Sequence, residues 1–486
     1  MALLGILLAL ALLMVLAYRG WSVLLLAPLA AMFAAATAGE PLLAHWTQTF
    51  MMSAARFIAQ FFPIFLLGAL FGKLMDDSGS VTAIANFFTA KLGAQRAILA
   101  VVISGALVTY GGVSLFVAFF VLVPMANRLF EAARIPKRFM PATIALGTMT
   151  FTMSALPGSP AIQNAIPMPF FGTTPFAAPG LGLIASAVML VFGLIWLRRA
   201  KGAPPADVQA VPPREDLAKP QIDKNAELLL RERSTQAGYF DLAEIPHGAK
   251  TPALPSIGIA LLPLAVVIGV NLCMSLFIVP RWDVAFLAEP AWGNTSIAAV
   301  GGVWSVLTAL IAAIVTLVAC NRRRLGSLRD TMDAGANASA LPVLSVASLV
   351  GFGSVIAALP AFDIVRDWVL GIQGGPLVSL TVATNVLAAL TGSASGGLTI
   401  ALESLGETFM RVAADTGLDP ALMHRVAVIG AGTLDSLPHN GAVVTLLSVC
   451  GTTHREGYMD MVVVGILGPI LALVTIIVLG SFLGSF

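Results

Sequence analysis

Charged residues are scarce in this 486-residue chain. Asp, Glu, Lys and Arg together make up 11% of it, and the net charge is +2. So small a charge supplies no basic surface for nucleic acid, and we expect no nucleic-acid partner. The three cysteines, Cys273, Cys320 and Cys450, have neither pairing nor metal-ligand spacing. We therefore expect neither a disulfide framework nor a bound metal or cofactor, and interpret the cysteines as small core residues.

Apolar residues are abundant instead. They make up 58% of the chain, and the mean hydropathy is +0.91. Many apolar runs are long enough to cross a bilayer, which predicts an all-α polytopic membrane protein. The first run has no basic region before it and no clear cleavage site, so we interpret it as a retained span. The uninterrupted spans are expected near 2–18, 21–38, 54–74, 179–197, 256–279, 296–319, 338–359 and 461–482.

One long polar segment, 199–253, divides the chain. Its low apolar content predicts a cytoplasmic linker between two halves, 1–198 and 254–486, with a short helix around 225–233. Basic residues next to the spans are expected to face the cytoplasm. They are Arg19, Lys73, the group at 128–138, the group at 198–201, and the run from Arg322 to Arg324 with Arg329.

The most unusual stretch is Gly432-Thr-Leu-Asp-Ser-Leu-Pro-His-Asn-Gly441, which interrupts an apolar segment. Polar groups at this depth cost several kcal/mol unless they are used or mutually satisfied. Pro438 removes a backbone donor and the glycines weaken the helix, which predicts a broken helix at about 424–450. The alternative is a simple proline kink whose polar groups bond to neighbouring helices.

A related stretch lies upstream. Leu156-Pro157 is again followed by small polar residues, which predicts a second broken helix at about 139–170. At matched distances before each Leu-Pro lies a cluster of glycine and hydroxyl residues, Thr109 to Ser114 and Thr391 to Gly397. Each cluster divides an apolar segment into arms of about 12 residues, or ~18 Å of helix, too short to cross the membrane. We interpret 97–125 and 376–408 as re-entrant hairpins; one long kinked span is the alternative.

Paired elements at matched spacing indicate an internal repeat. The first half is expected to cross the membrane five times, so the second half starts from the opposite face and the repeats are inverted. One hairpin then enters from each side, and both tips meet the two broken helices at the midplane, where transporters bind substrate.

Helix ends at this depth offer N–H groups and positive dipole ends, which favour a carboxylate. No Lys or Arg lies in either tip or either break, so we expect dipoles alone to hold the anion. The predicted substrate-binding residues are Thr109, Tyr110, Gly111, Gly112, Ser114, Ser154, Gly158, Ser159, Thr391, Gly392, Ser393, Ser395, Ser436, Asn440 and Gly441.

Coupling to an ion gradient requires an ionisable group. Asp435 and His439 are four residues apart, and we interpret His439 as the only histidine at membrane depth. The pair is either a proton acceptor or a hydrogen-bonded pair that fixes the loop. Glu403 is assigned either a coupling or a structural role. A channel, or an intramembrane enzyme with this pair as general base, is a further alternative, but no nucleophile or metal set accompanies the pair, so we predict no enzyme.

The motifs Ser436 to Ala442, Thr109 to Val113 and Leu156 to Gly158 resemble those of the gluconate permease family, GntP-type, within the ion-transporter superfamily. The resemblance implies a proton symporter of small hydroxy-monocarboxylates such as gluconate, glycerate or 3-hydroxybutyrate, in the lipid of a bacterial inner membrane. It also implies a homodimer with a fixed scaffold and an elevator-like transport domain. The Ser-Asn-Thr triplets of sodium-dicarboxylate carriers are absent from both tips, which argues against the alternative, a sodium-coupled citrate or dicarboxylate carrier.

Overall fold

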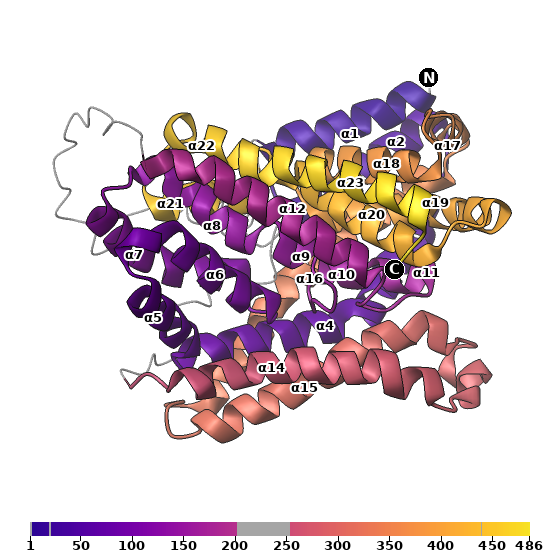
Figure 1. The fold of residues 1–486 in the computed structure, drawn as a ribbon. Coiled ribbons are helices and arrows are strands. Elements are labelled where there is room, and N and C mark those ends of the chain that lie inside the picture. Colours follow the sequence, from indigo (N-terminus) through magenta and orange to yellow (C-terminus); the bar gives the residue numbers. More distant parts are fainter. Residues whose placement is uncertain (1, 19–20, 202–252, 439) are drawn as a thin grey trace.

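The computed structural model describes residues 2–18, 21–201, 253–438 and 440–486. These residues form helices and connections without a strand, as the sequence predicts (Figure 1). Within them, seven helices are long and apolar enough to cross a membrane, or eight if one bent pair is a single span. The chain is therefore a multi-pass membrane protein. The predicted linker helix at 225–233 lies outside the described residues.

The first half contains long helices, one bent pair and one interrupted segment. Its elements are α1 (Ala2–Tyr18), α2 (Val23–Ala38), α3 (Leu42–Ala44), η1 (His45–Phe50), α4 (Met51–Asp77), α5 (Ser80–Leu92), α6 (Ala97–Tyr110), α7 (Leu115–Ala133), α8 (Met140–Thr148), α9 (Phe151–Ser154), α10 (Ile162–Ala165), α11 (Pro167–Phe171) and α12 (Pro179–Leu197). A bend of 105° separates Ser80–Leu92 from Ala94–Tyr110.

The second half has a similar order. Its principal elements are α14 (Ile257–Cys273), α15 (Ile297–Asn321), α16 (Leu328–Ala358), α17 (Phe362–Leu370), α18 (Pro376–Thr391), α19 (Ala394–Thr416), α20 (Pro420–Thr433), η10 (Leu434–Ser436), α21 (Gly441–Cys450), α22 (His454–Val462), η11 (Val463–Leu467) and α23 (Gly468–Leu483).

Local chemistry explains where the helices stop and restart. Between α9 and α10, Pro157 and Pro160 flank Gly158, whose φ of +79° is readily adopted only by glycine. After the second interruption, Asn440 accepts a hydrogen bond from the Ala442 N–H at 2.7 Å and so caps α21. The interruptions thus have defined geometry on both sides.

Several helices are longer than predicted. The helix α7 continues to Ala133 because Arg128 and Glu131 are compatible with helix, and it ends at Arg134, which is left-handed with φ of 55°. With 19 residues, α7 is long enough to span the membrane rather than form a short arm. The helix α19 likewise extends beyond 408 to Thr416. The helix α16 begins at Leu328 instead of 338, because Ser327 caps its first turn.

A buried ion pair corrects one prediction. Lys73 is not an exposed flanking residue: its side chain is buried, and its Nζ lies 2.9 Å from Asp77 Oδ1. Thr331 of α16 donates to the other oxygen, Asp77 Oδ2, at 2.7 Å. The pair therefore belongs to the contact between α4 and α16.

Helices of the first half pack directly on helices of the second half. The helices α4 and α16 lie together, α2 packs on α16, and α15 packs on α4. Figure 1 shows α14 and α15 along one edge and α1 and α2 toward the opposite edge. Between them, α6 packs on α8, α18 on α20, and α12 on α23. This arrangement places both interrupted segments inside the protein.

Candidate functional site

The first tip (109–114) is bonded to the segment that carries the first break (155–161). Thr109 Oγ1 lies within hydrogen-bond distance of Thr152 Oγ1 at 3.2 Å, Gly147 O at 3.3 Å and Gly105 O in its own helix at 2.9 Å. The Tyr110 hydroxyl donates to Pro157 O at 2.7 Å. The tip thus holds a carbonyl that the proline-containing break leaves outside any helix.

The second tip (391–397) is bonded in a similar way to the second break (434–440). Asp435 Oδ1 accepts from the Ala394 N–H at 2.9 Å and from Asn440 Nδ2 at 2.6 Å. Asn440 Nδ2 also donates to Gly392 O at 2.8 Å. Asn440 is fully buried and Asp435 is half-buried. One carboxylate and one amide therefore connect the tip to the break.

The helix α20 connects the two breaks. Ser154, next to the first break, lies against Gly432 near the second: a Cβ at Gly432 would be 3.1 Å from Ser154 Cβ. Arg425 of the same helix donates from Nη1 to Ser154 O at 3.4 Å. Polar groups of both halves are thus linked in one internal region.

A small cavity lies beside the first tip and the first break. Its volume is about 30 Å³, enough for water but not for a sugar acid. It is lined by Ile64, Gly68, Thr109, Gly112, Val113, Leu115, Met153, Pro160 and Ala161. Since Ile64 and Gly68 belong to α4, the cavity lies between this long helix and the interrupted segment.

Comparisons with known proteins place this arrangement in a family. A family model described as GntP family permease matches residues 1–193. The transporter YxjC of Bacillus subtilis, described as uncharacterized, is 39% identical over 470 residues, which cover 95% of each chain. The chain belongs to the GntP permease family. The Gnt-II system L-idonate transporter of Escherichia coli is 24% identical to this permease over 374 residues, covering 76% of the permease and 73% of the relative. A high-affinity gluconate transporter of the same organism is 22% identical over 371 residues.

A solved structure is similar in fold. Neisseria gonorrhoeae MtrF, whose structural study describes a class of antimetabolite efflux pumps, aligns with a TM-score of 0.51 at 12% identity. The alignment covers 89% of the permease and 83% of MtrF. At this identity the likeness concerns the fold alone.

Sequence reasoning missed a buried cation. Arg425 of the permease is 0% exposed, and its guanidinium donates to Ala177 O at 2.7 and 3.2 Å, to Pro175 O at 3.4 Å, and to Asn164 Oδ1 at 3.3 Å, as well as to Ser154 O. Neither tip and neither break contains Lys or Arg, but this cation from α20 lies beside the first break, so the helix dipoles are not the only positive charge there. The cation escaped notice because it comes from α20 rather than from a tip or a break. An arginine inside the apolar stretch that follows Pro420 is the signal that marks it.

A second histidine is also buried. His424 is 0% exposed; its Nδ1 lies 2.6 Å from Thr173 Oγ1 and its Nε2 lies 3.2 Å from Asn164 Oδ1. His424 thus lies within the helical interior. His439 itself lies outside the described residues, and so does the predicted Asp435–His439 pair. The described partners of Asp435 are the Ala394 N–H and Asn440.

Other predicted site residues serve the local structure of the first half. The Ser114 hydroxyl accepts from Phe116 N and caps α7, while Ser154 Oγ donates to Thr150 O at 3.0 Å. Gly111 lies against Leu264, so that a Cβ there would be 2.1 Å from the Leu264 Cδ2 atom. Asn271 donates to Gly158 O at 2.9 Å, and Asn164 donates to Ser159 O at 2.9 Å.

The remaining predicted residues belong to the second half. Thr391 Oγ1 donates to Ser393 O at 3.1 Å, and the Ser393 and Ser395 hydroxyls are 3.2 Å apart. Ser436 O accepts from the Tyr458 hydroxyl at 3.1 Å, and Gly441 begins α21. Glu403 lies further along α19 on its exposed face, and its electrostatic partner is Arg56 of α4. Among the described residues, no group of three or more His, Cys, Asp or Glu side chains forms a metal site.

Proposed function

We propose that this permease imports a small hydroxy-monocarboxylate, of the gluconate, glycerate or 3-hydroxybutyrate type, together with protons across a bacterial inner membrane. The substrate class is supported by relatives named as gluconate and L-idonate transporters. These names describe sugar acids with one carboxylate and several hydroxyls. The hydroxyl and amide groups of the tips and breaks suit such a ligand.

One observation supports proton coupling most directly. Asp435 joins the second tip to the second break, and its described donors, the Ala394 N–H and the Asn440 amide, are both neutral. Within the described residues, protonation of this carboxylate therefore breaks no ion pair. Its position ties that protonation to the geometry of the tip, and thereby to the substrate site.

The element order supports two inverted repeats, 1–198 and 254–486, joined by the linker at 199–253. The helices α4, α6 and α7 correspond to α16, α18 and α19, and each half has one interrupted helix after them. We propose that α4 and α16 belong to a fixed scaffold of a homodimer, and that the tips and breaks belong to a moving domain. The cavity of about 30 Å³ is too small for substrate, so this scheme requires movement away from α4 to open the site.

Proteoliposomes that contain the purified permease test the proposal. Radiolabelled gluconate uptake is measured with an imposed inward proton gradient and, separately, with an inward sodium gradient. The wild type should respond to protons, and Asp435→Asn should reduce proton-driven uptake by about tenfold or more. Asp333→Asn is the matched control, because Asp333 is an exposed partner of Arg329. Uptake that follows sodium and ignores the proton gradient would falsify the coupling.

A further inference from the structure

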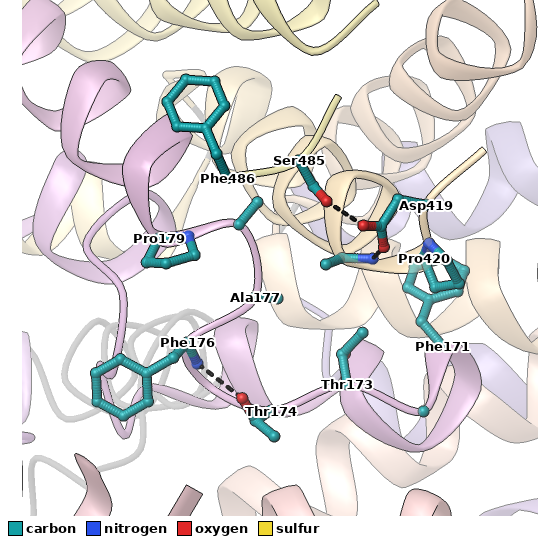
Figure 2. A pocket seen from close by; sticks show the side chains of 13 residues that line it. Phe171, Thr173, Thr174, Phe176, Ala177, Pro179, Asp419, Pro420, Ser485 and Phe486 are labelled. Atoms are coloured by element: carbon teal, nitrogen blue, oxygen red, sulfur yellow. Dashed lines mark hydrogen bonds between the residues drawn. The ribbon is translucent and has the colours of Figure 1, made fainter. Parts of the chain in front are cut away.

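A second, open cavity lies at the beginning of α20. Its volume is about 460 Å³, and it is formed where the loop between α11 and α12 meets the start of α20 and the last residues of the chain (Figure 2). The side chains of Thr173, Thr174, Asp419 and Ser485 contribute polar groups to its wall. Figure 2 shows Ser485 bonded to Asp419, and Thr174 bonded to the Phe176 N–H on the other side of the cavity. Thr173 lies between these two bonded pairs and takes part in neither of them.

The cavity faces the side opposite the cytoplasm. Pro179 lines it and begins α12, a helix of 19 residues, or ~28 Å, that ends before Arg198 and Arg199. Basic residues at the end of a span mark the cytoplasmic side. The opposite end of α12, and the cavity with it, is therefore on the external side.

Hydrogen bonds fix the tautomer of His424, which is bonded to Thr173 of the cavity wall. Asn164 Nδ2 donates to Ser159 O at 2.9 Å and to Pro175 O at 3.0 Å, so that its Oδ1 faces Arg425 and accepts from it. Because the same Oδ1 meets His424 Nε2, this nitrogen carries the hydrogen. His424 Nδ1 is then the acceptor of the Thr173 hydroxyl hydrogen, at 2.6 Å.

This geometry accommodates both protonation states of the imidazole. If Nδ1 gains a proton, it donates to Thr173 Oγ1 after the hydroxyl rotates, while Nε2 continues to donate to Asn164 Oδ1. In the transfer itself, a hydronium in the cavity gives its proton to Thr173 Oγ1, and the hydroxyl hydrogen passes to Nδ1. Water and an imidazolium remain, and one positive charge has moved from the cavity to His424.

We propose that His424 is a proton-binding site loaded from the external cavity through Thr173, and that Arg425 links its protonation to the binding of an anion beside the first break. This inference rests on the proposed symport function and adds a second proton site to it. The acceptors of Arg425 within the described residues are neutral oxygens, so its charge is not cancelled there. That charge opposes an imidazolium on His424. An anion near Ser154 offsets the charge, and by linkage a protonated His424 strengthens anion binding by the same factor.

Few other charges act on His424. Asp419, at the start of α20, lies on the cavity wall, and Tyr110 interacts electrostatically with Arg425. The helices α9, α10, α11, α18, α23 and η11, which also pack on α20, carry no ionisable side chain, and the charged residues of α19 lie on its exposed face. The carboxylate of Asp435 in η10, which also packs on α20, lies 11 positions further along the chain than His424. Arg425 is thus the fixed charge nearest to the imidazole along the chain.

Two transport assays on reconstituted full-length protein test the inference. Gluconate counterflow without a gradient reports substrate exchange, and gluconate accumulation under an inward proton gradient reports coupling. The variants are His424→Gln and Thr173→Val, with Thr174→Val as the matched control, because Thr174 lines the same cavity but the one described hydrogen bond of its side chain is from the neighbouring Phe176 N–H. We expect the first two variants to lose accumulation by about tenfold or more and to lose much less of the counterflow, and the control to retain both.

The outcomes distinguish the possible failures. Full proton-driven accumulation by His424→Gln overturns the inference. An equal loss of counterflow and accumulation in a variant that melts like the wild type also overturns it, because equal losses indicate a structural role. If His424→Gln does not fold, Thr173→Val decides, and full accumulation by this variant is the overturning result. Absence of proton-driven gluconate accumulation in the wild type would instead overturn the proposed function, and this inference with it.

Discussion

Replacing Asn440 with alanine should uncouple the second tip from the second break. The side chain is 0% exposed; it donates to Gly392 O at 2.8 Å and to Asp435 Oδ1 at 2.6 Å, and it caps α21 through the Ala442 N–H. Loss of the cap costs about 1 kcal/mol, and Gly392 O, left without its described donor, costs roughly 1–3 kcal/mol. Asp435 keeps the Ala394 N–H but loses a second hydrogen bond to its charged group, which costs roughly 1.5–3 kcal/mol. These groups share one site and are not fully additive, so we expect a total of roughly 3–5 kcal/mol.

The measurement is the unfolding of purified protein in detergent, combined with gluconate uptake in proteoliposomes. Asn440→Ser retains a capping hydroxyl but is too short to connect Gly392 with Asp435, so it should recover about 1 kcal/mol of stability without recovering uptake. Asn321→Ala is the control: this asparagine is also 0% exposed, but its described side-chain bonds, to Leu317 O at 3.1 Å and from Arg324 at 3.4 Å, stay at the end of α15. If Asn440→Ala and Asn321→Ala have equal stability and equal uptake, the tie between tip and break has no energetic role and the reasoning is refuted.

Two further substitutions examine the packing. Lys73→Met alone leaves the buried Asp77 without its cation and should destabilise the protein by about 3–5 kcal/mol. The double variant Lys73→Met/Asp77→Leu should lose less stability. Equal losses of stability in a thermal unfolding series would contradict this expectation. At Gly397, a Cβ would lie 2.2 Å from the Ala388 backbone nitrogen, so Gly397→Ala should force the arms α18 and α19 apart and abolish uptake. Gly258→Ala, whose Cβ meets nothing within 4 Å, should leave uptake unchanged, and similar behaviour of the two alanine variants in the uptake assay would refute the close approach.

The interruptions could be predicted from the sequence because their causes are local. Pro157 and Pro438 remove backbone donors wherever the chain places them, and the polar residues around them have no favourable position in an apolar span. Apolar length likewise predicts α1, α2, α12 and α15 within a few residues. These features depend on a few neighbouring residues, which the sequence displays directly.

The side chains and carbonyl groups that contact the interrupted segments could not be predicted in the same way. Whether Arg425 meets water or the carbonyls of Pro175 and Ala177 depends on where the loop before α12 folds, which is a tertiary property. The sequence predicts that Lys73 flanks a span on the cytoplasmic side, because it follows an apolar run. In the structure α16 covers Lys73, and Thr331 of α16 donates to its partner Asp77. A charged residue beside an apolar run is thus ambiguous until the neighbouring helix is known.

Arg425 and Asp435 lie on one continuous segment, ten positions apart, or ~15 Å along a helix. The cation is surrounded by carbonyl oxygens near the first break, whereas the carboxylate accepts from the N–H of the second tip and from Asn440. A single negative charge beside Arg425 offsets this cation. While His424 is neutral and Asp435 is ionised, a second carboxylate on the same substrate would be desolvated without a cation of its own, and Asp435 would repel it at the other end of the segment. We therefore expect the distribution of charge along α20 and η10, before proton uptake, to favour a monocarboxylate over a dicarboxylate.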